Sequence, residues 1–446
     1  MNRRIVIRLA AAAALITLLA PAVMAQRMGF SRDEFVRRRA ALMDEVKTGT
    51  IVLFGDVADT PGMRFRQDND FFYFTGNEDL GAVLIMFTMT KDAFLFLPEQ
   101  TDAEVRFDGP NLIKDPEAKA KTGLSGVFPV SRLDEFLARS MARTGGAIHL
   151  RLSPRDEMDG ARYETTLMAA RAARNHYNDQ VSLDLYRIEK LKSRYPQAEF
   201  KDVTPFIDAL RAIKTPEEIE ILRRNGKLSA EGVRQAMLAT KPGVFEYEIE
   251  AAALGVVLKG GARGASYASI VGSGPNTCTY HYDENSRRTV AGDLVLMDFG
   301  ADLGHMTMDI TRTWPASGRF TDEQKAVYRT VLEVEKACIE AYKPGATPQD
   351  VGEHVAAVLK AKGLDPRGLR GGFGHGVGLA VHDVSLGPVL KEGMVFAIEP
   401  ALYYPEKELG IRIEDTVLIT KDGCEVLTKD VPKEIEDIEK LLSGRK

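Results

Sequence analysis

The sequence predicts an α/β protein in which an N-terminal α/β domain precedes a second domain built from a duplicated unit. The chain has 446 residues, too many for one ordinary core. Residues 291–300 (AGDLVLMDFG) align with residues 392–401 (EGMVFAIEPA). Around each stretch runs the same order: helix, Lys-Pro-Gly, helix, a loop with histidine, and a hairpin with carboxylates. We therefore expect a pseudo-two-fold axis in the second domain.

Residues 1–25 predict an export signal. Arg3 and Arg4 form a basic start, an apolar core runs from Leu9 to Leu19, and small residues ending at Ala25 form a cleavage site. The apolar stretch is shorter than the ~20 residues of a membrane span. A retained anchor is the alternative. We expect cleavage after Ala25, export to a bacterial periplasm, and no membrane span in the mature chain.

The first folded domain is expected over residues 26–204. Ser31 begins a capping box that opens an amphipathic helix. Strands are predicted at GTIVLFG, FFYFTG, AVLIMFT, DAFLFLP and GAIHLRL, and a helix at TTLMAARAARNHY. On pattern alone, Asp68 and Asp70 belong to an ordinary loop. The second domain is expected over residues 205–446.

Helix starts mark the two halves of the second domain. Thr215 and Thr321 each begin a capping box, with Glu218 and Gln324 three residues later. Further along each half, Lys-Pro-Gly precedes another helix-like stretch, EYEIEAAALGVVLKGG in one half and PQDVGEHVAAVLKAKG in the other. The repeated order predicts two equivalent units that face each other.

Each unit also carries two carboxylates in apolar, strand-like runs, which are costly to bury unless paired or bound to metal. LVLMDFG and MTMDITRTW predict a hairpin centred between Leu303 and Gly304. Asp298 and Asp309 would then lie directly opposite each other, with Cβ atoms ~5 Å apart. Glu399 and Glu414 are likewise equidistant from a turn at Glu406-Lys407. A solvent-facing hairpin would explain one such pair but not two matched pairs.

Four carboxylates with one imidazole, His375, are an oxygen-rich ligand set suited to two divalent metal ions. The glycines before His375, in GGFG, allow the backbone to approach a site closely. His281 and His382 align with each other in the repeat, which marks them as further candidates. The cysteines have no spacing typical of a zinc-thiolate site. We expect surface or packing roles for the other four histidines, His149, His176, His305 and His354. Of these, His305 lies at the predicted turn and is expected to point to solvent.

These residues and motifs resemble the pita-bread metallopeptidases, within the Xaa-Pro aminopeptidase and prolidase branch. The resemblance runs from about residue 205 to 435 and rests on SYASIVGSGPN with HYDEN, MDFG with DITRTW, FGHGVGLAVHD, IEPALY and GIRIED. The stretch RFRQDNDFFYFTGNEDLGAVLIM resembles the N-terminal, creatinase/aminopeptidase-P-like domain of the same enzymes.

The resemblance implies site residues and metals. His281 and His382 match the family's outer histidines, which contact substrate and stabilise the tetrahedral intermediate. Arg412 and Tyr403 match substrate-binding positions in the same pocket. The metals would be two divalent ions, Mn²⁺ by family precedent, with Co²⁺ or Zn²⁺ able to replace it. The intact ligand set disfavours a non-catalytic binding protein or an amidinohydrolase of this fold. By resemblance, the metal ligands are Asp298, Asp309, His375, Glu399 and Glu414.

The reaction expected is hydrolysis of the N-terminal Xaa-Pro peptide bond. Activated water attacks the carbonyl, Glu399 is the candidate general base, and His281 and His382 donate hydrogen bonds. An Xaa-Pro dipeptidase is the alternative, because Gly371 stands where some aminopeptidases carry another histidine; RQDNDFFYFTG favours the aminopeptidase. Expected partners are peptides with proline second and further copies of this chain, in a dimer or tetramer. The net charge of −5, without a basic stripe, disfavours nucleic acid.

Overall fold

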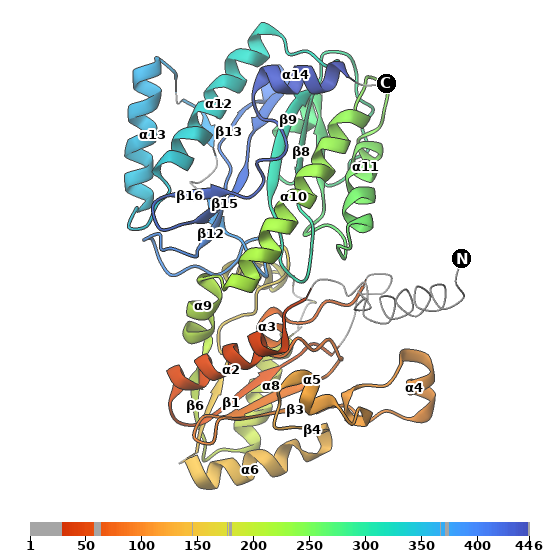
Figure 1. Ribbon diagram of the computed structural model, residues 1–446, viewed down its shortest axis with the longest axis vertical. Helices are drawn as coiled ribbons and strands as arrows, with labels where there is room; N and C mark the ends of the chain where they lie inside the picture. The colour runs from red at the N-terminus through yellow and green to blue at the C-terminus, as the bar shows by residue number, and fades with distance from the viewer. Residues whose placement is uncertain are drawn as a thin grey trace, which may run out of the picture.

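The structure is a computed structural model that describes residues 29–57, 64–144, 146–175, 177, 181–365, 367–370 and 374–444. The predicted export signal, His176 and Gly371 lie outside these residues. Two lobes lie one above the other, the lower formed by the first half of the chain and the upper by the second (Figure 1). The predicted architecture, an N-terminal α/β domain before a duplicated α/β domain, is confirmed. Within the described part of the chain, we find no helix with the length and apolarity required to cross a membrane.

A six-stranded mixed sheet forms the N-terminal domain, in the order β4-β3-β2-β1-β5-β6. The strands β1, β2 and β3 are antiparallel, whereas β4, β5 and β6 join in parallel. Four of the predicted strands are confirmed, as β1, β2, β3 and β5. The strand bounds are β1 Thr50–Phe54, β2 Val83–Phe87, β3 Asp92–Leu97, β4 Gly126–Pro129, β5 Ala147–Leu150 and β6 Glu199–Asp202.

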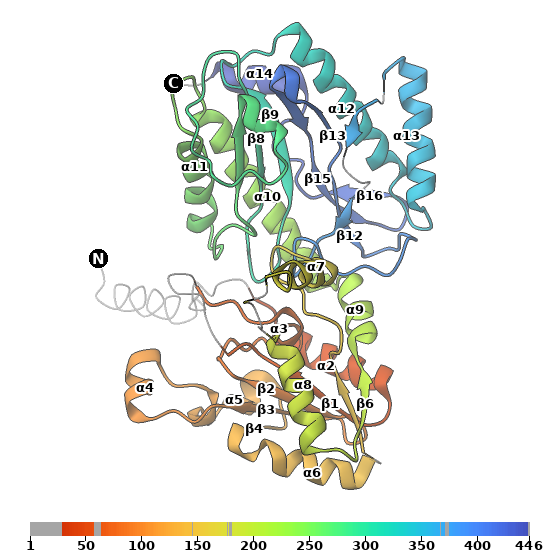
Figure 2. The same cartoon turned by 180° about the vertical axis from the view of Figure 1, so that it is seen from behind.

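Helices cover both faces of this sheet (Figures 1 and 2). Ile51 and Leu53 pack in one buried cluster with Leu42 of α2, whereas Val52 packs in another with Leu191 of α8. This alternation is the side-chain period of a strand that is covered on both sides. The helix bounds are α2 Arg32–Val46, α3 Asn69–Thr75, α4 Asp102–Asp108, α5 Ala118–Thr122, α6 Leu133–Thr144, α7 Arg162–Ala172 and α8 Leu183–Arg194.

The predicted strand FFYFTG is wrong, because this segment forms helix α3. The Asp68 side chain accepts a hydrogen bond from the Phe71 N–H at 2.9 Å and caps the helix start. Gly76 ends the helix in the left-handed conformation, with φ +62°. Every residue of α3 is buried, and periodicity does not distinguish a short helix from a strand when all sides are apolar.

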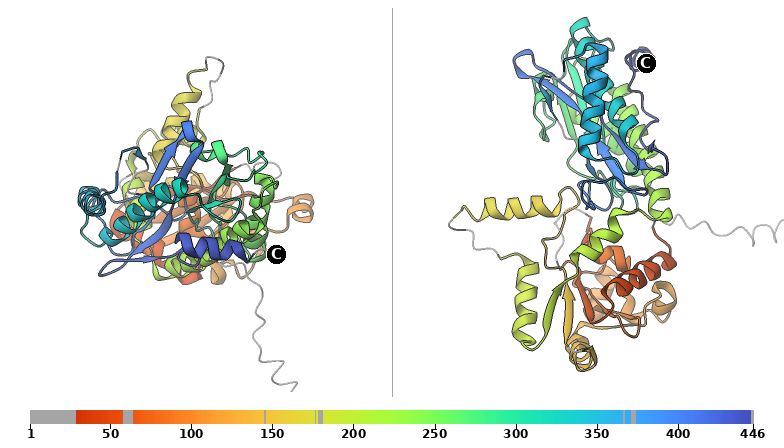
Figure 3. Two further views of the ribbon diagram at one scale, coloured as in Figure 1. Left: turned by 90° about the horizontal axis from the view of Figure 1, so that it is seen from above. Right: turned by 90° about the vertical axis from the view of Figure 1, so that its left-hand side faces the viewer.

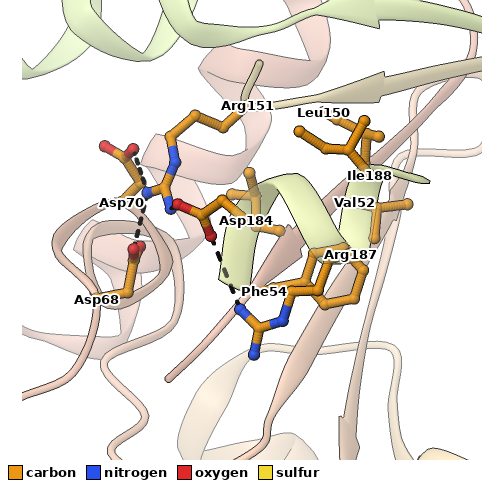
Figure 4. A pocket seen from close by; sticks show the side chains of 10 residues that line it. Val52, Phe54, Asp68, Asp70, Leu150, Arg151, Asp184, Arg187 and Ile188 are labelled. Carbon is orange, nitrogen blue, oxygen red and sulfur yellow. Dashed lines mark hydrogen bonds and ion pairs between the residues drawn. The ribbon is translucent and has the colours of Figure 1, made fainter. Parts of the chain in front are cut away.

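The two aspartates expected in a loop are instead buried ion-pair partners (Figure 4). The guanidinium group of Arg151 lies 2.8 Å from Asp68 and 2.9 Å from Asp70. It also lies 2.9 Å from Asp184 on α8. Both Asp68 and Asp70 are almost fully buried, so this cluster fixes α3 against the sheet.

The C-terminal domain repeats one arrangement twice. Helices α10 and α11 precede the sheet β7-β8-β9, and helices α12 and α13 precede the sheets β10-β13-β14 and β11-β12-β15-β16. Both capping boxes predicted in this domain are confirmed: the Thr215 N–H donates to Glu218 at 2.8 Å, and the Thr321 N–H donates to Gln324 at 2.9 Å. At Ser31 in the first domain, the side chain caps the helix by accepting the Glu34 N–H.

The bounds of these elements are α9 Thr204–Ala212, α10 Pro216–Ala239, α11 Glu246–Lys259, β7 Ile270–Ser273, β8 Leu294–Phe299, β9 Ile310–Pro315, α12 Asp322–Ala341, α13 Pro348–Lys362, β10 Leu369–Arg370, β11 His375–Gly376, β12 Val395–Ile398, β13 Ala401–Tyr404, β14 Leu409–Arg412, β15 Asp415–Ile419, β16 Cys424–Val426 and α14 Ile435–Ser443. Short 3₁₀ turns occur at Leu112–Lys114, Val130–Arg132, Gly274–Cys278 and Pro405–Lys407.

Candidate metal centre

The first carboxylate hairpin has a register different from the predicted one. Its turn is at Gly304 and His305, which both have positive φ, +62° and +65°. Such a two-residue turn matches the twist of the strands it joins. The hairpin is therefore centred one residue later than predicted, and Asp298 lies opposite Thr311 rather than Asp309. The shift moves each partner by two positions, so both aspartates stay on one face.

Tyr267 brings the two aspartates together. Its hydroxyl lies 2.5 Å from Asp298 Oδ1 and 2.6 Å from Asp309 Oδ1. Burial raises the pKa of Tyr267 well above its ordinary value, and the two carboxylates raise it further, so the phenol stays protonated and can donate. Sequence reasoning assigned no role to Tyr267, although the motif SYASIVG that contains it was among the recognised signals.

The second carboxylate hairpin has the predicted register. Ala401 pairs with Arg412 in one sheet, and Ile398 pairs with Asp415 in the next. Glu399 and Glu414 lie where the chain passes between these sheets. Glu414 also joins the halves, because the Thr311 hydroxyl donates to its carboxylate at 2.6 Å and its N–H donates to the Thr311 carbonyl at 3.0 Å.

His375 completes the cluster from β11, which pairs with β12. Its Nε2 lies 3.6 Å from Asp309 Oδ2 and 3.7 Å from Glu399 Oε1. One ligand atom each from Asp309, His375 and Glu414 lies within 4.8 Å of the others, a spacing that can hold a metal ion. The structure therefore gathers all five predicted ligands at the meeting of the two halves.

The backbone beside His375 requires glycine. Gly374 has φ +120°, and a Cβ there would lie 1.8 Å from the Ala397 carbonyl oxygen. Gly374→Ala is therefore expected to lower the free energy of unfolding by about 2–6 kcal/mol, from backbone strain plus overpacking. Gly292→Ala is the matched control, because Gly292 has φ +97° with no atom near that position; strain alone predicts about 1–3 kcal/mol. Urea unfolding measures both, and equal losses would contradict the close approach.

Burial and the neighbouring carboxylates raise the pKa of three acids in the cluster, Asp309, Glu399 and Glu414. Burial raises the pKa of Asp309 and Glu414 well above the ordinary range, and the neighbouring carboxylates add to the effect. Burial also raises the pKa of Glu399, against the influence of Arg412. Like charges this crowded are stabilised by a cation, and carboxylate oxygens with one imidazole suit a hard divalent ion. The donor set therefore fits the metals that the sequence predicts.

The imidazole of His375 stays neutral, as a metal ligand must. Burial, with a smaller contribution from the neighbouring His382, lowers its pKa to about 4. The two rings lie 4.1 Å apart between centroids.

Two cavities open on the cluster and share the His382 side chain as a wall. The larger, of about 560 Å³, is lined by His375, His382, Phe396 and Glu399, and by Tyr163 of the N-terminal domain. The smaller, of about 250 Å³, is lined by Tyr267, His281, Asp298, Asp309 and His382. The predicted pair of outer histidines is thus brought to one cavity beside the carboxylates.

Arg412 and Tyr403, the predicted substrate-binding residues, contact each other beside Asp298. The Arg412 side chain is 4 % exposed, and its Nη2 lies 2.5 Å from Asp298 Oδ2. Its Nη1 donates to the Tyr403 hydroxyl at 3.0 Å. Although burial opposes it, Asp298 keeps the pKa of Arg412 well above its usual value. The guanidinium group therefore holds Asp298 in place.

The prediction that His305 points to solvent is wrong. Its side chain is buried, and its ring stacks on Phe72 with centroids 3.5 Å apart. Its Nε2 lies 3.2 Å from Glu78, and nearby Arg66 reaches Asp302 at 3.1 Å. The turn between the two aspartates therefore docks on the N-terminal domain, a contact that local sequence does not reveal.

Comparison with known proteins agrees with this site. Residues 35–149 match the N-terminal domain of aminopeptidase P, and residues 220–421 match metallopeptidase family M24. The Xaa-Pro aminopeptidase of Escherichia coli K12 is 32% identical, over 92% of this chain and 98% of that protein. The Xaa-Pro dipeptidase of Pyrococcus furiosus is 37% identical, over 56% of this chain and 72% of that protein.

Solved structures agree as well. Aminopeptidase P from E. coli, determined with the inhibitor Pro-Leu, superposes with a TM-score of 0.79 at 30% identity, covering 94% of this chain and 99% of that one. The two-domain fold and the cluster of carboxylates and imidazole define a metallopeptidase. More closely, the chain belongs to the aminopeptidase P family, and it is a metallo-aminopeptidase.

Proposed function

We propose that this protein hydrolyses the N-terminal Xaa-Pro bond of peptides and releases the N-terminal amino acid. The observation that carries the proposal is the cluster of four carboxylates and His375 beside a cavity walled by His281 and His382. The extent of the similarity favours aminopeptidase over dipeptidase. The E. coli aminopeptidase matches almost the whole chain, N-terminal domain included, whereas the P. furiosus dipeptidase matches little more than half of it.

The proposed cofactor is a pair of divalent ions, with Mn²⁺ as first choice and Co²⁺ or Zn²⁺ as substitutes. When bound, such ions neutralise the carboxylates and lower the pKa of water, so that hydroxide is available near neutral pH. The residues that would hold them are Asp298, Asp309, His375, Glu399 and Glu414.

The protein's own groups then divide the remaining work. Glu399 borders the larger cavity, where it can take the proton of the attacking water and pass it to the leaving prolyl nitrogen. His281 and His382 face the smaller cavity and can hydrogen-bond the peptide and the developing oxyanion. Tyr267 and Arg412 hold Asp298, so they orient the ligand set.

A substrate panel tests the specificity. With Mn²⁺ present, the protein is expected to release the N-terminal residue from Ala-Pro-Ala. Ala-Ala-Ala is the matched control, because its scissile bond has an N–H that proline lacks. Cleavage of Ala-Pro but not of Ala-Pro-Ala would identify the protein as an Xaa-Pro dipeptidase. Equal cleavage of Ala-Pro-Ala and Ala-Ala-Ala would refute proline specificity.

We also propose that the mature protein begins at Gln26, after export, and that it forms a dimer or tetramer. The proposal rests on the composition of residues 1–25 and on family analogy. The intact mass of the purified, exported protein and its sedimentation coefficient test the two statements separately.

A further inference from the structure

The N-terminal domain places a carboxylate against His382, which lines both cavities of the site. Glu164, in the first turn of α7, lies with both oxygens 2.9 Å from Nδ1 of His382, although the two residues are 218 positions apart. Helix α7 starts at the junction of the two lobes and projects away from it (Figures 2 and 3). The pair is therefore a contact between domains, made beside the cavity that Ala161, Tyr163 and His382 line.

The Glu164 carboxylate is itself held in place. It accepts the Ala161 N–H at 2.6 Å, at the start of α7, and the Tyr163 hydroxyl at 3.1 Å. Burial raises the pKa of Glu164, but these donors and His382 together lower it below its ordinary value, so the carboxylate is ionised. Arg162 anchors the same turn by binding Asp208 at 2.7 Å and buried Asp70 at 3.0 Å. Glu164 thus meets His382 from a fixed position.

The neighbours of His382 are held from the same side. The Val381 N–H donates to the Met158 carbonyl at 2.8 Å. Asp383 binds Lys214 at 2.7 Å and the buried Arg211. Residues 381–383 therefore contact the N-terminal domain or the segment of α9 and Lys214 that joins the two domains. Of these contacts, only the one from Glu164 reaches the His382 ring.

We propose that Glu164 is a positioning residue that sets the ring orientation and tautomer of His382. An ionised carboxylate only accepts hydrogen bonds, so Nδ1 must carry a proton. Nε2 is then the nitrogen that faces the peptide: in the neutral ring it accepts a hydrogen bond, and it donates one to an oxyanion when the ring carries a second proton. Carboxylates that orient a functional histidine in this way are known to act through the ring they hold. The proposal deepens the proposed peptidase function and rests on it for its kinetic consequences.

Substitutions at Glu164 test the proposal. Glu164→Leu is expected to lower kcat for Ala-Pro-Ala about 10–100-fold with KM changed less than about threefold, because the residue acts through His382. Glu164→Gln keeps an acceptor and the hydrogen bond to Ala161, so it should retain more activity. Met168→Ala, on an exposed position of α7, is the control and should leave both constants unchanged.

A double-mutant cycle separates positioning from a structural role. In a His382→Ala background, Glu164→Leu should cost less than about twofold, because coupled residues are not additive. The same loss in both backgrounds, or no loss in the parent protein, would overturn the proposal.

A readout independent of catalysis keeps the two hypotheses distinguishable. In protein with ¹⁵N-labelled histidine, the His382 ring nitrogens, assigned by comparison with His382→Ala, should show Nδ1 protonated, and Glu164→Leu should shift them. Unchanged ring shifts in Glu164→Leu would overturn the proposal even in an active enzyme. If Glu164→Leu shifts the His382 ring resonances but the parent protein cleaves no proline peptide, only the proposed peptidase function is overturned.

Discussion

Asp309→Ala is expected to lower the peptidase activity more than about 100-fold. It removes a predicted metal ligand itself, not a residue that orients one. Asp309 contacts both halves of the site: its Oδ1 lies 2.6 Å from the Tyr267 hydroxyl and its Oδ2 lies 3.6 Å from His375 Nε2. With His375 and Glu414 it forms a group of ligand atoms spaced to hold a metal ion. Metal content should fall with the activity. Mass spectrometry of bound metal and amino acid release from Ala-Pro-Ala measure the two quantities side by side.

The same substitution has a distinctive effect on stability. In metal-free protein it removes one of several crowded, buried carboxylates, so the protein should unfold no more readily than the parent. Mn²⁺ should raise Tm for the parent far more than for the variant, since a ligand stabilises the state that binds it. Asp422→Ala, in an exposed turn, is the control. Unchanged metal content and an unchanged Mn²⁺ effect in Asp309→Ala would contradict the assignment.

Arg211→Met is expected to lower the free energy of unfolding by about 3–5 kcal/mol, the cost of leaving buried charges without their partner. The guanidinium group is 1 % exposed and binds three buried carboxylates: Asp70 at 2.7 Å, Asp156 at 2.5 Å and Asp383 at 2.5 Å. Two of these belong to the N-terminal domain and the third follows His382. The substitution should therefore also lower the peptidase activity, because residues 381–383 lose a contact that holds them in place.

Arg223→Met is the matched control for Arg211→Met. Arg223 forms an ion pair with Glu425 at 2.7 Å, but the side chains are 43 % and 32 % exposed. An exposed pair contributes about 0–1 kcal/mol, so this variant should unfold almost as the parent does. Urea unfolding of both variants gives the comparison. Equal losses would show that the buried cluster does not bind the domains together.

The sequence predicts features of this protein that are set locally or repeated. Capping boxes at Thr215 and Thr321 mark real helix starts, and the repeat places Asp298 and Glu399 in equivalent hairpins. The second hairpin keeps its predicted register, because its turn is centred on the residues that the sequence indicates. The first hairpin does not keep its predicted register, because its turn requires a positive φ at His305, a conformation that non-glycine residues rarely adopt.

What the sequence does not reveal depends on contacts between distant segments. The sequence of helix α3 predicts a strand, because all of its residues are buried and the pattern lacks a helical period. Its cap at Asp68 has no distinctive sequence pattern. His305 and Glu164 find their partners in the opposite domain, 233 positions away for Phe72 and 218 for His382. No periodicity or spacing encodes such pairs, and only the tertiary structure shows them.

The most direct test of the proposed function is a Mn²⁺ titration of metal-stripped protein. Release of alanine from Ala-Pro-Ala should start near zero and rise with bound metal up to about two ions per chain. Glu399→Gln, which replaces the proposed proton carrier, should stay inactive throughout. Full release by stripped protein, or no release once the metal is bound, would contradict a metal-dependent Xaa-Pro aminopeptidase.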